Sequence, residues 1–313
     1  MTISSRPYAS EEDFWSMRHF LRDVFGLNRS HMVSWHVARL DYARWHVCLN
    51  CAHVTLQDVA FLWEAEGQLI GFVMPDGGRG EAHLCVHPVW QTAGLERQML
   101  DVAEQRLASV DPGGACRLTV WCPGRDRARQ GLLAGRGYHK AEESEHQWRR
   151  RLDAPISDAP LAEGYVVRAL EDGPVLLDRC YASGLAFHPD DINVAIENRR
   201  DPTWYRNIQT APLYRRDLDL VAVAPDGTIG AFCTIWFDDV TRSGYFEPVA
   251  TVPAHQRRGL AKAVMTEGLR RLQRMGALTA FVSGYGEAAN ALYRSVMGPE
   301  YDLYEPWGRV WGN

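Results

Sequence analysis

Hydrophobic and polar residues alternate along the chain with spacings typical of helices and of strands. The same order of predicted helices and strands appears in both halves of the chain. The first half predicts helices at 11–25 and 31–49, strands at 59–64, 69–74 and 82–86, a helix at 95–107 and a strand at 117–122. The second half predicts a strand at 165–169, helices at 174–183 and 191–198, strands at 220–224, 228–237 and 244–250, a helix at 260–275 and a strand at 278–283. Strands that alternate with helices in this way predict an α/β fold.

A stretch without periodicity separates the two halves. Residues 153–160 read Asp-Ala-Pro-Ile-Ser-Asp-Ala-Pro, a composition typical of a linker. The 313 residues are also enough for two domains of about 150 residues each. We therefore expect a first domain at 1–153, a linker at 154–163 and a second domain at 164–313.

Composition and charge restrict the kinds of partner and substrate that we expect. Hydrophobic residues make up 46% of the chain, which predicts a folded protein, and no apolar run is long enough to span a membrane. The net charge of -5 and the pI of about 6.1 argue against nucleic acid as a partner and favour a cationic or neutral small substrate. The N-terminus does not resemble a secretory signal, so we expect a cytoplasmic protein.

The seven cysteines predict free thiols, because they are odd in number and scattered along the chain. Cys48 and Cys51 form a Cys-x-x-Cys pair, but no second pair completes four metal ligands. We expect structural cysteines and no metal ion.

The turn from Thr251 to Ala261 is the strongest functional signal. It joins a strand to a helix through Gln-x-x-Gly-x-Ala, so backbone N–H groups and the positive end of the helix dipole can face one anion. Gly259 and Ala261 keep that surface free of large side chains. Three residues can add donors around it: Gln256, Arg257 and Arg258. The sequence predicts a pyrophosphate site.

These residues resemble the acetyl-CoA-binding core of the GNAT acyltransferases. The run Val249–Pro253 leads into the Gln-x-x-Gly-x-Ala turn, and a strand and a helix containing Leu292-Tyr293 follow in the same order as in that family. The repeat makes the whole chain similar in layout to tandem GNAT proteins of the mycothiol synthase type. The resemblance implies two domains, each a central mixed β-sheet flanked by helices, with catalysis in the second.

The resemblance also implies the residues that contact acetyl-CoA. They are Thr251, Val252, Gln256, Arg257, Arg258, Gly259, Leu260, Ala261 and Asn290. Asn290 departs from the family pattern, because the frequent Asn lies one turn earlier, where this chain has Gly286. A helical residue that faces solvent is an equal alternative for Asn290.

Two residues are candidates for acid–base catalysis. Glu247 lies on the strand from which GNAT enzymes often supply their base, and two-residue alternation puts it on one face with Val249 and Thr251. The alternatives are a surface glutamate or a local bulge that turns it to the other side. Tyr293 matches the family tyrosine that protonates the departing thiolate, and its alternative is a core aromatic residue.

The acceptor side gives weaker signals. The resemblance implies a cleft formed by the first helices and their loop, in which His188 is the candidate contact. A solvated loop histidine is the alternative. Asp190 and Asp191 could bind a cationic acceptor, but we expect one of them to be the N-cap of the helix that begins near Ile192. The C-terminal run at 301–307 predicts a last strand hairpin beside the active half.

The first half carries an altered copy of the turn. Leu84–Glu96 aligns without a gap on Val249–Ala261, but Thr92 and Ala93 replace the two arginines and Glu96 replaces the alanine. We expect the Glu96 carboxylate to occupy the place of a phosphate and repel it. Leu133 also stands where the second half has Tyr293. The first domain is therefore predicted to be non-catalytic.

The sequence thus predicts an N-acetyltransferase that transfers an acetyl group from acetyl-CoA to a primary amine of a small molecule. Two alternatives stay open: a non-catalytic protein that binds or senses acyl-CoA, and an acetyltransferase that acts on protein lysines or N-termini.

Overall fold

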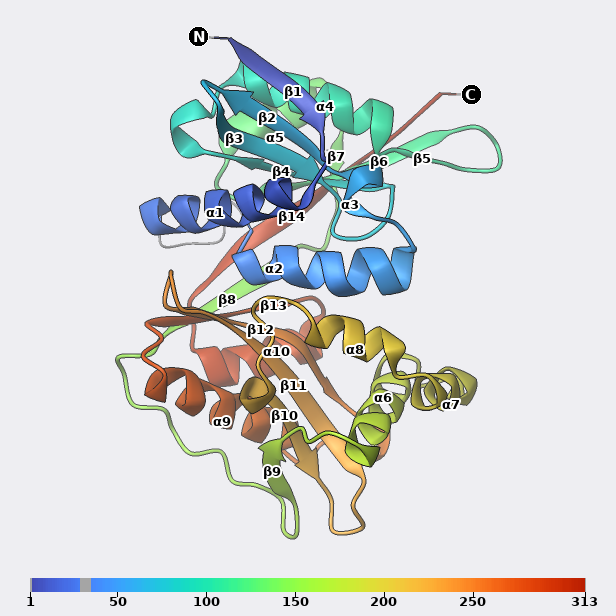
Figure 1. Ribbon diagram of the computed structural model, residues 1–313, viewed down its shortest axis with the longest axis vertical. Helices are drawn as coiled ribbons and strands as arrows, with labels where there is room; N and C mark the ends of the chain where they lie inside the picture. Colours follow the sequence, from blue (N-terminus) through green and yellow to red (C-terminus); the bar gives the residue numbers. More distant parts are fainter. Residues whose placement is uncertain (1, 29–34, 313) are drawn as a thin grey trace. The chain divides into compact units, whose positions relative to one another are not determined.

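The computed structural model describes residues 2–28 and 35–312, which divide into two compact units (Figure 1). The first unit runs to Gln147 and also includes the chain from Asp302 onward, and the second is Trp148–Tyr301. Residues 154–163, all of them described, contain no helix or strand. No described helix combines the length and the apolar character that a membrane crossing requires.

The first unit is a mixed sheet with strand order β1-β2-β3-β4-β6-β14. Its strands are β1 (Ile3–Pro7), β2 (Phe61–Ala65), β3 (Gln68–Met74), β4 (Glu81–Val86), β5 (Ser109–Val110), β6 (Cys116–Pro123), β7 (His139–Lys140) and most of β14 (Tyr301–Trp311). Its helices are α1 (Glu11–Asn28), α2 (Val37–Tyr42), a π-helix (Ala43–Ala52), α3 (Leu56–Val59), a 3₁₀ turn (Pro88–Trp90), α4 (Ala93–Arg106) and α5 (Arg127–Gly135). Strand β8 (Glu145–Arg151) begins in this unit and ends in the second.

Helices cover both faces of the first sheet. Phe20 of α1 contacts Phe72 of β3 with ring centroids 5.6 Å apart, and a Cβ at Gly71 would lie 3.3 Å from the Met99 side chain of α4. Neighbouring residues of a strand face opposite sides, so α1 and α4 cover opposite faces.

The second unit has strand order β13-β12-β11-β10-β9, with the end of β8 beside β13. Its further strands are β9 (Val166–Ala169), β10 (Asp219–Val223), β11 (Ile229–Asp238), β12 (Ser243–Thr251) and β13 (Thr279–Gly284). Its helices are α6 (Pro174–Phe187), α7 (Ile192–Arg200), α8 (Thr203–Gln209), 3₁₀ turns at Arg216–Leu218 and Pro253–His255, α9 (Leu260–Arg274) and α10 (Glu287–Met297).

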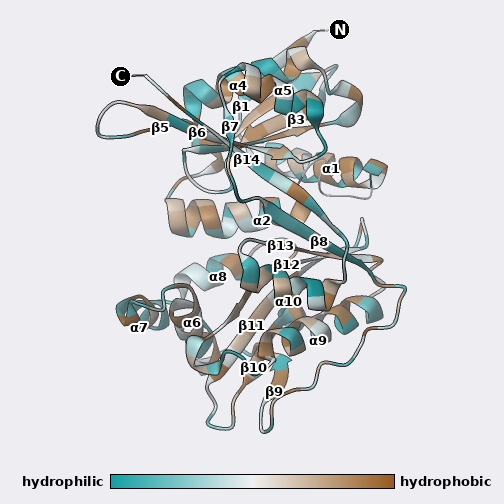
Figure 2. Cartoon of the chain, turned by 180° about the vertical axis from the view of Figure 1, so that it is seen from behind, coloured by the Kyte–Doolittle hydropathy of each residue, from teal (hydrophilic) through white to brown (hydrophobic). Residues whose placement is uncertain are grey.

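The core of the second unit lies between the sheet and the helices α9 and α10. Cys233 and Ile235 of β11 and Phe246 of β12 are fully buried there. Helix α9 fits closely because a Cβ at Gly268 would overlap the Ile235 side chain. Hydrophobic and hydrophilic residues alternate along α9, as expected for a helix with one buried face (Figure 2). Phe187 of α6 contacts Phe232, which faces the other side of the sheet.

The C-terminal strand belongs to the first unit. In Figure 1 the red strand β14 runs along the green strand β6, and Tyr304–Trp311 pair antiparallel with Cys116–Pro123. The prediction of a last hairpin beside the active half is wrong on this point, because the partner of β14 lies almost 200 residues earlier in the sequence. The end of β8 in turn joins the second unit, where the Leu152 N–H donates to the Leu278 carbonyl (2.9 Å).

The predicted helix at 31–49 differs from the structure. Residues 31–34 of this prediction lie outside the described part of the chain. The rest is the short helix α2, which continues as the π-helix Ala43–Ala52. Helix α8 was not predicted at all, because its seven residues are too few to show a periodicity.

Candidate active site

Strands β12 and β13 are paired only along the first part of β12. The parallel pairs run from Ser243 to Phe246, and β12 then continues for five residues beyond them. Phe246 pairs with Ile235 of β11 and Val249 pairs with Cys233, so three residues of β12 advance against two of β11. This is a β-bulge, and it contains Glu247. The candidate site residues on β12 therefore lie in the part of this strand that is no longer paired with β13.

The negative charge of Glu247, which lies in this bulge, affects the pKa of Tyr293. Glu247 is half-buried, and Tyr293 of α10 is only 7% exposed. Burial and, next, the negative charge of Glu247 raise the pKa of the Tyr293 hydroxyl. The same carboxylate helps to raise the pKa of Cys233, after burial and Asp219. The charge of Glu247 in the bulge therefore influences both the Tyr293 hydroxyl and the Cys233 thiol.

Gly284 at the end of β13 allows Tyr293 and Asn290 to approach the strand. A Cβ there would lie 2.7 Å from the tyrosine ring and 2.8 Å from the Asn290 Oδ1. That oxygen accepts a hydrogen bond from the Trp148 indole N–H (2.9 Å). The Asn290 carbonyl is therefore already bound within the unit, and only its amide nitrogen remains as a donor for a cofactor.

The turn before α9 presents backbone N–H groups at a helix start. Arg257 and Gly259 adopt left-handed backbone angles (φ 64° and 75°). The helix begins at Leu260, and the Ala263 N–H makes the first bond of the helix, to the Gly259 carbonyl (3.0 Å). The N–H groups of Leu260 and Ala261 precede that bond, so they are among the donors that a helix leaves unsatisfied. Gly259 and both arginines are exposed.

Val252 uses its backbone groups for hydrogen bonds within the protein, whereas its place in the motif predicts a contact with acetyl-CoA. Its N–H donates to the Gly230 carbonyl (3.0 Å), and its carbonyl accepts from the His255 N–H (2.8 Å). Both backbone groups are used to shape the turn. The exposed Gln256 reaches back to the Thr251 carbonyl (3.5 Å).

Tyr165 is a residue of the site that the sequence did not reveal. The Arg258 guanidinium donates to its hydroxyl (3.0 Å), and the same hydroxyl lies 2.7 Å from the His255 Nδ1. The three side chains hold the outer side of the turn in place. A tyrosine about 90 residues earlier gives no local signal of this contact.

His188 lies at the C-terminal end of α6. It caps the end of α6, with its N–H bound to the Gly184 carbonyl (2.8 Å), and its side chain is exposed. Asp191 is the N-cap of α7, since its carboxylate accepts from the Asn193 N–H (3.0 Å). The N-cap interpretation of Asp191 is confirmed.

In the first unit an ion pair occupies the corresponding place. The Glu96 carboxylate is buried and accepts from the Arg129 guanidinium (2.6 and 3.1 Å) and from the Gln91 amide (3.0 Å). Arg129 of α5 also donates to the Leu84 carbonyl of β4 (3.1 Å). The expectation that Glu96 faces the place of a phosphate is wrong, because Arg129 draws it inward. Leu133 is fully buried.

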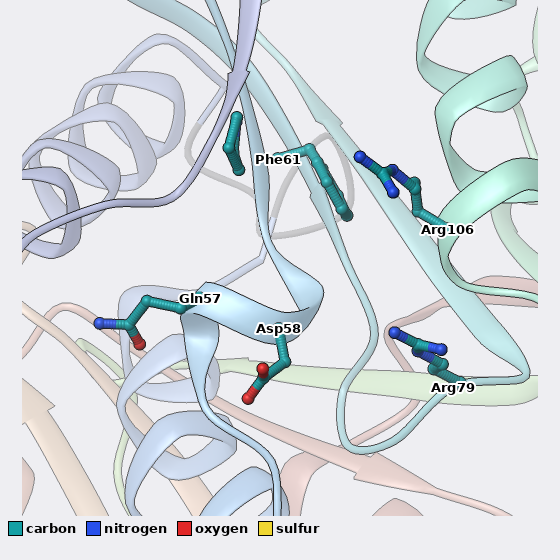
Figure 3. A pocket seen from close by; sticks show the side chains of 6 residues that line it. Gln57, Asp58, Phe61, Arg79 and Arg106 are labelled. Carbon is teal, nitrogen blue, oxygen red and sulfur yellow. The ribbon is translucent and has the colours of Figure 1, made fainter.

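A hollow of about 170 Å³ in the first unit is not connected with the predicted residues. It is lined by Pro7, Gln57, Asp58, Phe61, Arg79 and Arg106, which are drawn in Figure 3. The Asp58 carboxylate is bound to the N–H and the hydroxyl of Thr55 (2.8 and 2.7 Å).

Metal ligands do not gather in the described part of the chain: no group of three or more His, Cys, Asp or Glu residues there could hold an ion. All seven cysteines are free thiols, as predicted.

Comparison with known proteins assigns the site to a family. The model of the Acetyltransferase (GNAT) family matches residues 187–298, which include the bulge, the turn and α10. The chain carries a GNAT acetyltransferase domain. This makes the protein an acyltransferase, and the predicted family is confirmed.

Similarity to curated relatives extends beyond the residues that the family model matches. The chain is 26% identical over 250 residues to a mycothiol acetyltransferase of Paenarthrobacter aurescens, covering 75% of this chain and 71% of that protein. It is 28% identical over 249 residues to the mycothiol acetyltransferase of Salinispora arenicola, covering 73% and 74%.

Solved structures show that the whole chain has a tandem GNAT fold. A tandem GNAT protein from the clavulanic acid biosynthesis pathway aligns with a TM-score of 0.65 at 12% identity, over 100% of this chain and 99% of that chain. A GCN5-related N-acetyltransferase from Sphaerobacter thermophilus aligns with a TM-score of 0.63 at 18% identity, over 98% and 95%. The predicted α/β fold class is confirmed.

Proposed function

We propose that the second unit transfers an acetyl group from acetyl-CoA to a primary amine of a small molecule. The observation that supports the proposal is the β-bulge that holds Glu247, four residues before the turn that leads into α9, together with the influence of the Glu247 charge on the Tyr293 hydroxyl of α10. A carboxylate and a neutral hydroxyl near one point of a GNAT domain are the two proton-transfer groups that the reaction needs.

The donor would bind along the end of β12 and the start of α9. The N–H groups of Leu260 and Ala261, the helix dipole and the side chains of Gln256, Arg257 and Arg258 offer donors to a pyrophosphate. Gly259 leaves that surface open, because only the Pro160 carbonyl lies within 4 Å of where its Cβ would be. Thr251 and the amide of Asn290 would contact the pantetheine arm, and Val252 would shape the turn behind it.

Glu247 and Tyr293 would then move the two protons. Glu247 takes a proton from the acceptor ammonium, the amine nitrogen attacks the thioester carbonyl, and the carbon–sulfur bond breaks. Tyr293 donates to the departing thiolate, and its tyrosinate takes up, directly or through water, the second proton that the attacking nitrogen loses as the amide forms. Glu247 releases the first proton to solvent. A protonated Glu247 no longer raises the pKa of Tyr293, so the hydroxyl becomes a better donor when the thiolate leaves.

A small acceptor is supported by the relatives, whose name ties them to mycothiol, a small molecule. The test is to incubate the purified chain and acetyl-CoA with a panel of amines, amino acids, aminoglycosides and lysine peptides. Release of free CoA together with an acetylated small amine supports the proposal. Acetylation of peptides alone would make the protein a protein acetyltransferase, and binding without any transfer would make it an acyl-CoA-binding protein.

A further inference from the structure

Helix α6 buries an arginine whose hydrogen-bonding groups are unused. Arg179 has no exposed surface, and none of its three nitrogens has a hydrogen-bond partner in the described part of the chain. Its guanidinium carbon lies 3.5 Å from the centre of the Phe232 ring and 4.8 Å from that of Tyr205. Rings can stabilise the charge through their faces, but they do not satisfy the five N–H groups at the edge of the guanidinium.

Asp219 carries a buried carboxylate that the charge of Arg179 influences: burial raises the pKa of Asp219, and Arg179 opposes this shift. The oxygens of Asp219, however, are bound by other groups. Asp219 of β10 accepts from the hydroxyls of Tyr205 (2.7 Å), Tyr214 (2.8 Å) and Thr234 (3.3 Å). By contrast Arg18, the fully buried arginine on the first helix of the other unit, is ion-paired with Asp41. A buried guanidinium whose N–H groups make no hydrogen bonds is costly to keep, which points to a ligand as its hydrogen-bonding partner.

The position of Arg179 fits the acceptor side of the proposed site. Phe232, on which it lies, pairs across the sheet with Ala250 of β12, three residues after Glu247. Helix α6 ends at Phe187, whose ring also contacts the Phe232 ring and which is 51% exposed. The Arg179 guanidinium and the exposed Phe187 thus contact the same ring, so the buried guanidinium lies close to a part of α6 that solvent reaches.

We propose that Arg179 binds a carboxylate of the acceptor, so that the acceptor is an amine that carries a carboxylate near its amino group. This inference rests on the proposed function, since it places the ammonium toward Glu247 and the carboxylate toward Arg179. A planar guanidinium suits a carboxylate because it can form two parallel hydrogen bonds. A zwitterion of this kind is also neutral overall, in keeping with the acidic chain.

The test compares amino acids with amines that lack only the carboxylate, such as phenylalanine with phenethylamine and histidine with histamine. For each pair we measure the ratio of kcat/KM and, by calorimetry, the ratio of affinities. We expect at least one pair in which the carboxylated amine is preferred by about 10- to 100-fold, the range of a charged hydrogen bond. Arg179→Met should remove this preference, and Arg179→Lys should keep part of it.

The ratios do not depend on how much of a variant is folded, because both amines meet the same protein. Arg199→Met serves as the control, since Arg199 of α7 is more than half exposed and pairs with Asp178. Absence of a preference in the wild type, or a preference that Arg179→Met retains, overturns the inference. Transfer to amines without such a preference would leave the proposed function standing, whereas a preference in binding without any transfer would support Arg179 and refute the proposed function.

Discussion

The segments before α9 and before α4 align without a gap, but α4 begins at Ala93, two residues earlier in the alignment than α9 at Leu260, and different groups lie behind the two helix starts. In the second unit Ala261 leaves the helix start open, and two exposed arginines flank it. In the first unit Glu96 takes the alanine position and is locked to Arg129 of α5, which also reaches the Leu84 carbonyl. The two helix starts therefore differ at one aligned position: a small alanine leaves the N–H groups of α9 accessible to an anion, whereas Glu96 of α4 is one partner of a buried ion pair.

The contacts of Glu96 also explain how the first unit can bury this carboxylate and remain folded. A buried carboxylate without a partner would be costly, whereas the Glu96–Arg129 pair is satisfied by Gln91 and by the backbone. The first unit thus has a buried ion pair at the helix start where the second unit has Ala261.

The largest effect is expected from Gly259→Glu. A carboxylate at the start of α9 would repel the pyrophosphate, so we expect acetyl-CoA affinity to fall by about 100-fold or more in calorimetry. Gly259→Ala introduces the same left-handed strain without the charge and should keep most of the affinity. Gly94→Glu at the matching turn of the first unit should leave affinity unchanged. A comparable loss in Gly94→Glu would remove the distinction between the two turns.

Glu247→Gln should lower kcat by about 100-fold or more, the contribution of a general base. The loss should be greatest at low pH, where few acceptor amines are free without help. A pH–rate profile from pH 6 to about 9 checks this. A loss of equal size at every pH would contradict the role of a base.

Tyr293→Phe should lower kcat by about 10- to 100-fold and leave the KM for acetyl-CoA nearly unchanged, because the hydroxyl acts on the departing sulfur. Leu133→Phe, at the matching position of the first unit, should not affect kcat in folded protein. Full activity of Tyr293→Phe in steady-state assays would assign the proton to another group.

Removing one partner of the Glu96–Arg129 ion pair should destabilise the first unit. Glu96→Ala leaves the Arg129 charge buried without its carboxylate, which costs about 3–5 kcal/mol in the free energy of unfolding. The double variant Glu96→Ala with Arg129→Leu should recover much of that loss. Urea unfolding measures both. Neither variant should bind a second acetyl-CoA, since the arginines of the open turn are still missing. A second binding event in either would contradict this.

The smallest effect concerns His83, which aligns with Pro248 of the second unit. His83 is fully buried, and burial followed by the charge of Arg39 holds its pKa well below the ordinary value. Its folded pKa is depressed, so its contribution to stability is present above about pH 6.5 and is lost as the pH falls, by about 1.4 kcal/mol per pH unit. His83→Phe should flatten that slope in unfolding curves between about pH 6.5 and 5. An unchanged slope would assign the pH dependence to other groups.

Local patterns in the sequence predicted the turn, α9 and the α/β fold, because glycine spacing and periodicity are local properties. They could not predict the direction of Glu96, which depends on an arginine 33 residues later, or the neighbour of β14, which depends on a strand far away in the chain. The bulge at Glu247 was foreseen only as an alternative to regular alternation. The contact of Tyr165 with Arg258 and the burial of Arg179 arise from tertiary packing and have no local sign.

The central claim is that one unit of this chain binds acetyl-CoA and the other does not. A calorimetric titration of acetyl-CoA into the wild-type protein tests it most directly, with the number of sites per chain as the result. The account predicts one site, lost in Gly259→Glu and kept in Gly94→Glu. Two sites per chain, or one site that survives Gly259→Glu, would contradict it.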